Sequence, residues 1–189
     1  MYLAFDTETT GLEANSNVLT AYFIILDSDF NQIDNLNLQI KYPFYTVYPQ
    51  ALEVNKINLI SHHNDINSLN VNLAMIKLST FLEKNKKDNK YILLGHNVQF
   101  DIQMLINNNI FTQDIIDIYL DMDNLLDTFL YAKKLKNMKL IPYRQSLSLS
   151  KLIYYFDLNN ININFHNAED DIKVTILLYK KLKELELNN

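Results

Sequence analysis

Residues 2–12, YLAFDTETTGL, join a short apolar run to two acidic residues and a glycine. The apolar start, which includes aromatic side chains, is typical of a β-strand. Side chains alternate along a strand, so Asp6 and Glu8 leave the same face, at the end where the strand gives way to a turn. Two carboxylates this close repel, and each raises the pKa of the other unless a positive charge lies between them. The pair therefore indicates a site for a cation.

Length and composition restrict the other possibilities. The 189 residues are enough for one domain, which we expect to span 1–189, and 48% of them are hydrophobic. Without cysteine there is no disulfide, thiolate metal site or cysteine nucleophile. The net charge of −5 argues against a protein that holds nucleic acid mainly through a basic surface. With no apolar stretch of membrane-spanning length and no leader pattern, we expect a cytoplasmic protein that has no membrane partner.

The chain contains only two glycines, Gly11 and Gly95, although average usage is about 7%. A composition this poor in glycine retains it where other residues do not fit, either because φ is positive or because the backbone packs closely. Both glycines lie beside acidic motifs.

Periodicity and turn residues predict an α/β order with an antiparallel start. We expect three consecutive strands, a loop, a helix, a buried strand and a short helix. A short strand or turn should then lead into a helix, followed by two more helices. The predicted ranges, in that order, are 2–8, 18–27, 32–42, 42–50, 68–84, 90–96, about 100–107, 124–136, 146–158 and 167–185.

Further acidic residues lie at the starts of two of these helices. Asp101 follows a predicted strand, and Glu169, Asp170 and Asp171 come directly after His166. Acids in a first helical turn also complement the helix dipole, so neither stretch alone indicates catalysis. A helical wheel places Asp171 on the flank of the apolar stripe that faces the sheet and Asp170 roughly opposite. Glu169 lies on the other flank and is less easily excluded. Asp171 is therefore the expected inward ligand and Asp170 the expected solvated acid.

Together, Asp6, Glu8, Asp101 and Asp171 would form a group of four carboxylates without a neighbouring lysine. Hard oxygen ligands of this kind suit Mg²⁺ or Mn²⁺. Four carboxylates can bridge two such ions about 3.5–4 Å apart, the arrangement used for phosphoryl displacement. A histidine has an unperturbed pKa near 6.5, so His166 could accept the proton of an attacking water.

The stretch 131–145 contains Lys133, Lys134, Lys136, Lys139 and Arg144 and no acid. Charge runs of this kind are typical of solvated helix ends. Beside the acidic motifs, contact with the phosphate backbone of a nucleic acid is an equally reasonable interpretation.

DTETTGL (6–12), GHNVQFD (95–101) and HNAEDD (166–171) resemble the three motifs of the DEDDh exonucleases, the group that contains the proofreading ε subunits of bacterial polymerases. The resemblance continues through three further segments. PQALEVNKI (49–57) is similar to the segment after the third strand of that group. LLDTFLYAKKL (125–135) and SLSLSKLIYYFDL (146–158) are similar to two of its helices. It covers nearly the whole chain in order.

The resemblance implies a ribonuclease H-like fold, with a five-stranded mixed sheet whose first three strands are antiparallel and which helices flank. It implies release of nucleoside 5′-monophosphates from a 3′ end. Carried over, Asp6, Glu8, Asp101 and Asp171 would hold two divalent cations, and His166 would be the general base.

The same carry-over suggests substrate contacts. Thr9 and Leu12 match positions that contact the terminal nucleotide, Leu12 by packing against the base. Asn55 stands where the family often has histidine near the terminal sugar, and Gln50 where some members carry an acid. These two departures leave the substrate preference open. His96 is expected to hold a strand end by hydrogen bonds, and Phe100 to belong to the core.

Three functional hypotheses follow. The first is an exonuclease acting on single-stranded or frayed 3′ ends of DNA, with a separately encoded polymerase as a possible partner. The second is an RNA-trimming or oligoribonucleotide exonuclease, which differs in contacts to the 2′-hydroxyl. The third is a non-catalytic binding module of the same fold. Such modules normally lose metal ligands, whereas all five motif residues are present here.

Overall fold

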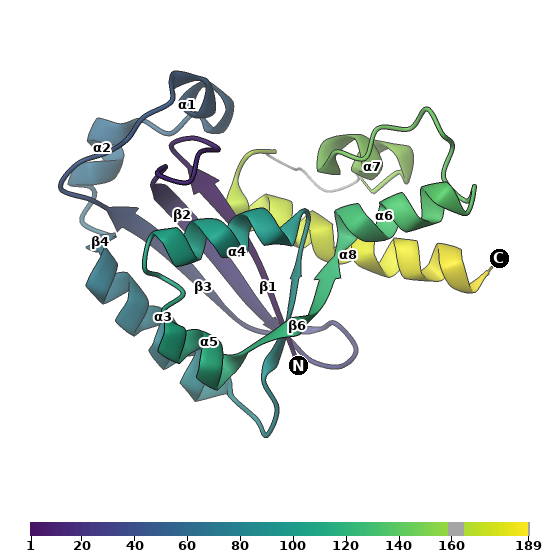
Figure 1. The fold of residues 1–189 in the computed structure, drawn as a ribbon, viewed down its shortest axis with the longest axis horizontal. Coiled ribbons are helices and arrows are strands. Elements are labelled where there is room, and N and C mark those ends of the chain that lie inside the picture. The colour runs from purple at the N-terminus through teal and green to yellow at the C-terminus, as the bar shows by residue number, and fades with distance from the viewer. Residues whose placement is uncertain (159–164, 189) are drawn as a thin grey trace.

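The structure, a computed structural model, describes residues 1–158 and 165–188. Its centre is a six-stranded mixed sheet with the strand order β4-β3-β2-β1-β5-β6 (Figure 1). Antiparallel pairing joins β1 to β2 and β2 to β3, and parallel pairing joins the other neighbours. The strands are β1 (Tyr2–Thr9), β2 (Val18–Leu26), β3 (Gln32–Lys41), β4 (Ser68–Asn70), β5 (Tyr91–Gly95) and β6 (Leu120–Asp127).

The predicted α/β fold with an antiparallel start is confirmed, but the expected count of five strands is wrong. The sixth strand is β4, a three-residue parallel edge strand that pairs with residues 39–41 of β3. We predicted a helix from residue 68. The helix begins instead at Val71, after Asn70, whose side chain accepts a hydrogen bond from the Leu73 N–H. Pairing with the exposed edge of β3 therefore extends the backbone of residues 68–70.

Eight helices surround the sheet in the described residues. The predicted loop over 42–50 ends where α1 begins, at Pro49, and α2 lies in a stretch for which we predicted no element. The helix predicted over 146–158 is confined to seven residues. The helices are α1 (Pro49–Asn55), α2 (Leu59–Asn64), α3 (Val71–Asn85), α4 (Val98–Asn107), α5 (Gln113–Tyr119), α6 (Thr128–Asn137), α7 (Leu149–Tyr155) and α8 (Ala168–Leu187).

Alternating side chains of β1 face two different cores. Leu3 and Phe5 point into the large apolar cluster that includes residues of α3, α4 and α5. Ala4 points the other way, toward Ile172 and Ile176 of α8. Burying a side chain of this size stabilises the fold by about 1.5–3 kcal/mol. Asp6 and Glu8 share the face of Ala4, so α8 covers the face that carries them.

A third apolar cluster lies between α6, α7 and α8. Leu135 of α6 and Leu152 of α7 pack there with Leu178 of α8, and all three side chains are fully buried. Figure 1 shows α6 and α7 stacked beside α8, with α7 and α1 on opposite sides of the end of β1.

Close packing accounts for both glycines, since neither has a positive φ. A Cβ at Gly11 would collide with the Tyr48 ring and lie 2.7 Å from Ser16 Oγ. A Cβ at Gly95 would lie 2.9 Å from Val98 Cγ2. The two residues allow the turns after β1 and β5 to approach their neighbours. Within the described residues, no helix is both long enough and apolar enough to cross a membrane.

Candidate active site

An opening in the sheet forms where β1 extends beyond its parallel neighbour β5. β5 pairs with β1 only along residues 2–4 of β1, and it ends at Gly95, where the chain turns into α4. On this side the second half of β1 has no strand partner. On its other side, β1 stays paired with the antiparallel strand β2 as far as Thr9. Crevices of this kind, beyond the carboxyl ends of strands in an α/β sheet, commonly bind ligands.

Three carboxylates converge at this opening. Asp6 and Glu8 project from β1, and Asp171 projects from the first turn of α8. One oxygen of each lies within 4.8 Å of the others, so the three form a group able to hold a metal ion. The Asn167 side chain caps α8 by accepting the N–H groups of Glu169 and Asp170. The helix thereby places Asp171 inward, 9% exposed, while Glu169 pairs with Lys173.

Asp171 has one satisfied and one unsatisfied oxygen. Its Oδ2 accepts a hydrogen bond from the backbone N–H of His166 at 3.1 Å. Its Oδ1 is buried and has no hydrogen-bond partner in the described residues. An unpaired buried oxygen is unfavourable, and a bound cation would satisfy it. The donor set, carboxylate oxygens alone, fits a hard divalent cation.

Burial raises the pKa of every carboxyl group in this cluster, and repulsion from neighbouring acids of the cluster adds to the effect for Asp6 and Glu8. Burial raises the pKa of Glu8 to about 7, with a further increase from Asp171. Burial likewise raises the pKa of Asp171 to about 6. The pKa of Asp6 lies well above its usual range, because burial and the charges of Asp101, Asp171 and Glu8 all disfavour ionisation. No lysine or arginine within residues 1–158 and 165–188 forms an ion pair with these three groups.

Asp101 approaches β1 from α4 and does not join the three-residue group. Its Oδ1 accepts two hydrogen bonds from Thr7, one from the backbone N–H at 3.0 Å and one from the hydroxyl at 2.6 Å. It therefore occupies the edge of β1 that β5 leaves unpaired. Burial still raises the pKa of Asp101 to about 7, although both Thr7 bonds act in the opposite direction. The charge of Asp101 also raises the pKa of Asp6.

His166 directly precedes the cap of α8 and is exposed. Its φ is 68°, in the left-handed region, and this turn directs its N–H toward Asp171. The structure thus brings the backbone of His166 to the acidic cluster and leaves the imidazole accessible.

A pocket of about 470 Å³ adjoins the acids on the α1 side and is lined by all three residues predicted to contact substrate. Leu12 is 80% exposed there, as an apolar side chain available for packing against a ligand. Asn55 is already engaged: its Nδ2 donates to the Thr9 carbonyl, and its Oδ1 accepts from the Ile57 N–H. It also hydrogen-bonds to Glu8, and this bond lowers the pKa of that carboxyl group.

Two aromatic residues complete the pocket. Tyr48, half-buried, lies against Gly11, and Phe100 of α4 lines the opposite wall. The assignment of Phe100 to the core is only partly right, because the ring packs on the large apolar cluster and also faces the pocket. Phe100 lies inside the motif GHNVQFD (95–101), and nothing in that motif indicated that its ring would face a pocket.

Asp127, at the end of β6, is a site residue that sequence reasoning missed. Its carboxylate accepts hydrogen bonds from the N–H groups of Asn97, Val98, Phe129 and Leu130. It therefore ties the starts of α4 and α6 together and fixes the helix that carries Asp101. His96 acts nearby as expected, with Nδ1 hydrogen-bonded to Thr128 Oγ1 at 2.9 Å.

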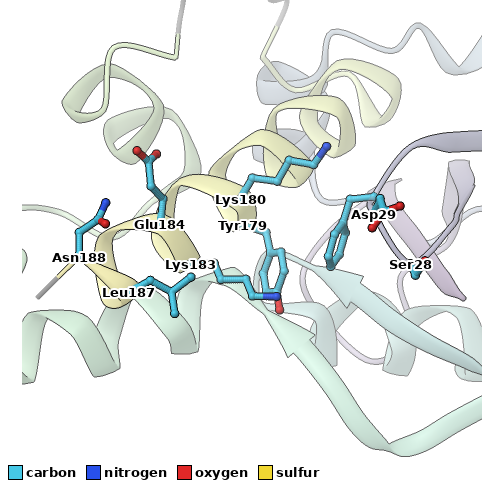
Figure 2. A pocket seen from close by; sticks show the side chains of 9 residues that line it. Ser28, Asp29, Tyr179, Lys180, Lys183, Glu184, Leu187 and Asn188 are labelled. Atoms are coloured by element: carbon cyan, nitrogen blue, oxygen red, sulfur yellow. The ribbon is translucent and has the colours of Figure 1, made fainter.

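A second pocket, of about 460 Å³, lies between the β2–β3 turn and the last turns of α8. Figure 2 shows Tyr179 and Lys183 on the side of α8 that faces Ser28 and Asp29 of that turn. Lys183 lies over the Phe30 ring at 6.0 Å. No group of three metal-binding side chains lies here among the described residues, so the opening at β1 is the stronger candidate.

Comparison with known proteins finds similar folds among solved structures. Neither the models of protein families nor the curated proteins give a match. Exonuclease I of E. coli, in complex with a dT13 oligonucleotide, is similar with a TM-score of 0.73 and 22% identity, covering 99% of this chain and 42% of that one. The chain has an exonuclease-like fold. The resemblance in fold that the three motifs predicted is thereby confirmed.

Two further structures agree. The catalytic unit of Neurospora crassa Pan2, which contains a protease and a nuclease domain, has a TM-score of 0.62 and 19% identity, covering 99% of this chain and 27% of that one. Cell-death related nuclease 4 has a TM-score of 0.67 and 14% identity, with coverages of 97% and 64%. The chain spans less than half of the length of Exonuclease I, and identity at this level shows the fold alone.

Proposed function

We propose that this protein is a divalent-metal-dependent 3′→5′ exonuclease of the DEDDh type, which removes nucleoside 5′-monophosphates from single-stranded or frayed DNA ends. The observation that carries the proposal is the convergence of Asp6, Glu8 and Asp171 within 4.8 Å, with one buried oxygen of Asp171 unpartnered. A stable fold does not need three adjacent carboxylates that lack a counter-charge, whereas phosphodiester chemistry does.

The residues divide the work as follows. Asp6, Glu8 and Asp171 would hold Mg²⁺ or Mn²⁺, and Asp101, whose Oδ1 is held by Thr7, would be the fourth carboxylate of a two-cation site. The bound cations would supply positive charge to the attacking and leaving oxygens. A zinc-bound form of the E. coli Exonuclease I–ssDNA complex is among the similar structures, in keeping with a metal-binding site in this fold.

His166 is the proposed general base. It is exposed at the margin of the acidic cluster and has a backbone tie to Asp171, so its imidazole can take the proton of the attacking water. The water oxygen then bonds to phosphorus and the bond from phosphorus to the 3′-oxygen breaks. The 3′-oxygen takes a proton from solvent, so the shortened strand leaves with a 3′-hydroxyl.

The pocket beside Glu8 is the proposed seat of the terminal nucleotide. Thr9 and the exposed Leu12 would contact its base and sugar, while Asn55 positions Glu8 and the end of β1. The similarity in fold to Exonuclease I, whose structure contains a bound oligodeoxynucleotide, supports DNA as the proposed substrate of this protein. In a proofreading role the protein would act with a separately encoded polymerase.

The test is digestion of matched oligonucleotides. Purified protein is incubated with 5′-labelled single-stranded DNA and with RNA of the same sequence, in Mg²⁺, Mn²⁺ or EDTA. We expect a ladder that shortens from the 3′ end, mononucleotide products, faster loss of DNA, and no reaction in EDTA.

Two variants sharpen the result. Asp171→Asn should lose activity, whereas Asp29→Asn, which changes an exposed acid in the β2–β3 turn, should not. If neither DNA nor RNA is shortened in either metal, the proposal is wrong. If RNA is shortened faster than DNA, the enzyme is an RNA exonuclease and the assignment of substrate is wrong.

A further inference from the structure

A separate surface of the molecule concentrates positive charge. Residues 128–156, here called the basic lobe, contain six of the 17 lysines and arginines and none of the 22 acids, so the rest of the chain is strongly acidic. The basic lobe comprises α6, α7 and the loop between them. Its apolar side chains, such as Leu135 and Leu152, are buried against α8. The cations are therefore left on the outer side.

Most of these cations have no internal partner. Lys134 pairs with Glu186. The other exposed cations of the basic lobe form no ion pair in residues 1–158 and 165–188; they are Lys133, Lys139, Arg144 and Lys151. Like charges on one small surface repel, and an extended polyanion relieves this repulsion. An anionic ligand is therefore the occupant that this charge favours.

Exposed aromatic rings lie among the cations. Tyr143 is 89% exposed, and Lys136 lies over its ring at 5.4 Å while donating to the Gln145 carbonyl. Tyr154 and Tyr155 of α7 are also exposed. Cations interspersed with exposed aromatic rings are typical of surfaces that bind single-stranded nucleic acid, because cations follow the phosphates and bases stack on the rings. Paired bases could not reach these rings in the same way.

The basic lobe is anchored at the edge of the candidate active site. The Tyr154 ring lies 6.1 Å from the ring of Phe165, the residue before His166. The backbone of Leu147, in the loop before α7, forms a hydrogen bond with the His96 side chain at the end of β5. Thr128, the first residue of α6, hydrogen-bonds to the same histidine. Figure 1 shows α7 on the opposite side of the end of β1 from α1, which lines the nucleotide pocket.

We propose that the basic lobe binds the part of a single-stranded DNA substrate that lies on the 5′ side of the nucleotide being removed, through Lys133, Lys139, Arg144, Lys151 and a base stacked on Tyr143. This inference rests on the proposed function, since it places the nucleotide being removed on the α1 side of β1 and the rest of the DNA strand on the α7 side. The basic lobe contributes length-dependent affinity and takes no part in bond cleavage.

The test compares two substrates. One is the p-nitrophenyl ester of thymidine 5′-monophosphate, which occupies only the nucleotide pocket. The other is a 5′-fluorescein oligothymidylate of about 20 nucleotides, long enough to cover a single-strand site of about 4–16 nucleotides. Binding of the oligonucleotide is measured by fluorescence anisotropy in EDTA over a series of salt concentrations. Hydrolysis of the ester is measured in Mn²⁺.

The variant Lys139→Gln/Arg144→Gln removes two free cations, and Lys77→Gln/Lys87→Gln removes two exposed cations from α3 and the loop after it as a matched control. We expect the first variant to bind the oligonucleotide more weakly, with the slope of log K against log salt reduced by about 0.7 for each lost phosphate contact. Tyr143→Ala should weaken binding about tenfold, the scale of one base–aromatic stack. Hydrolysis of the ester should be unchanged in all three.

The outcomes separate the two proposals. If wild-type protein hydrolyses the ester but both basic-lobe variants bind the oligonucleotide like the control, the inference about the basic lobe is overturned and the exonuclease proposal stands. If lobe-dependent binding is found without hydrolysis of either substrate, the surface assignment stands and the exonuclease proposal fails. Tighter binding of oligouridylate than of oligothymidylate overturns the assignment to DNA.

Discussion

The carboxylates of Asp6 and Asp127 lie near the C-terminal ends of two strands of the sheet, β1 and β6, in opposite surroundings. Four backbone N–H groups donate to Asp127, so its charge is fully satisfied by the fold. No hydrogen bond to the Asp6 carboxylate is present in the described residues, and its nearest charges are those of other acids. One acid stabilises the structure and the other destabilises it. Because an unfavourable arrangement has no structural use, Asp6 and its neighbours are the functional site that we propose.

The largest effect should come from replacing a destabilising acid. Asp6→Asn keeps the shape of the side chain but removes one ligand charge, so we expect exonuclease activity to fall by about 10²–10³-fold or more, the scale for losing one preorganised electrostatic group. The metal-free variant should melt at the same temperature as wild type or higher, because repulsion with Glu8 and Asp171 is relieved. Nuclease assays and thermal melts measure the two quantities. A variant that retains activity and melts lower would reverse the comparison.

Asp127→Asn should show the opposite pattern. An amide offers one acceptor oxygen and turns an N–H₂ group toward N–H donors, so several capping bonds of α4 and α6 are lost. We expect the free energy of unfolding to fall by about 2–4 kcal/mol, since the bonds are charge-assisted and cap two helices. Denaturant titration measures this. The matched control is Asp34→Asn, whose partner Lys84 is exposed and whose loss should change stability by about 1 kcal/mol or less.

The comparison also predicts how stability varies with pH. The pKa is about 7 for Glu8 and about 6 for Asp171 in the fold, against ordinary values of 4.5 and 3.8. A carboxyl group with a raised pKa in the folded state holds its proton more tightly when folded than when unfolded. Its contribution to stability is therefore full below pH 4 and is lost as pH rises from 4 to 7.

Metal-free protein should accordingly melt at a lower temperature at pH 8 than at pH 5, as far as these groups are concerned. Mn²⁺ should raise the melting temperature more at pH 8, because its ligands must be deprotonated. Differential scanning fluorimetry with Mn²⁺ or EDTA across this pH range measures both effects. In Asp6→Asn/Asp171→Asn both dependences should flatten. An equal Mn²⁺ effect at pH 5 and pH 8 would show that the cation binds elsewhere.

The two kinds of acid differ in how well the sequence reveals them. Strand alternation put Asp6 and Glu8 on one face, and helical periodicity turned Asp171 inward, because both depend on local geometry that holds in any fold. The role of Asp127 depends on backbone donors 29 and 30 residues away, and no local pattern records those contacts. Strand β4 was missed for the same reason, since three residues become a strand only through the edge of β3.

The smallest predicted effect concerns Thr7, which donates hydrogen bonds to Asp101. Asp101 is intermediate between the satisfied acid Asp127 and the acids of the cluster around Asp6. Thr7→Val removes the 2.6 Å hydroxyl bond to Asp101 but keeps the shape of the side chain and the backbone N–H bond at 3.0 Å. Since one bond to a buried charge is lost, we expect the free energy of unfolding to fall by about 1–2 kcal/mol. Thr80→Val, whose hydroxyl bonds to a carbonyl of its own exposed helical turn, is the control and should change stability by less.

The activity of Thr7→Val decides whether Asp101 belongs with the destabilising acids or with Asp127. If Asp101 is a metal ligand positioned by Thr7, the variant should need a higher Mn²⁺ concentration for half-maximal activity, by about 10–100-fold, the usual effect of losing a partner of a metal ligand. If Asp101 only ties α4 to the edge of β1, stability should fall while the Mn²⁺ requirement stays that of wild type. A metal titration of Thr7→Val and of the control Thr80→Val therefore shows whether Asp101 is a metal ligand or a structural residue. Asp101 is the acid whose surroundings contain features of both roles.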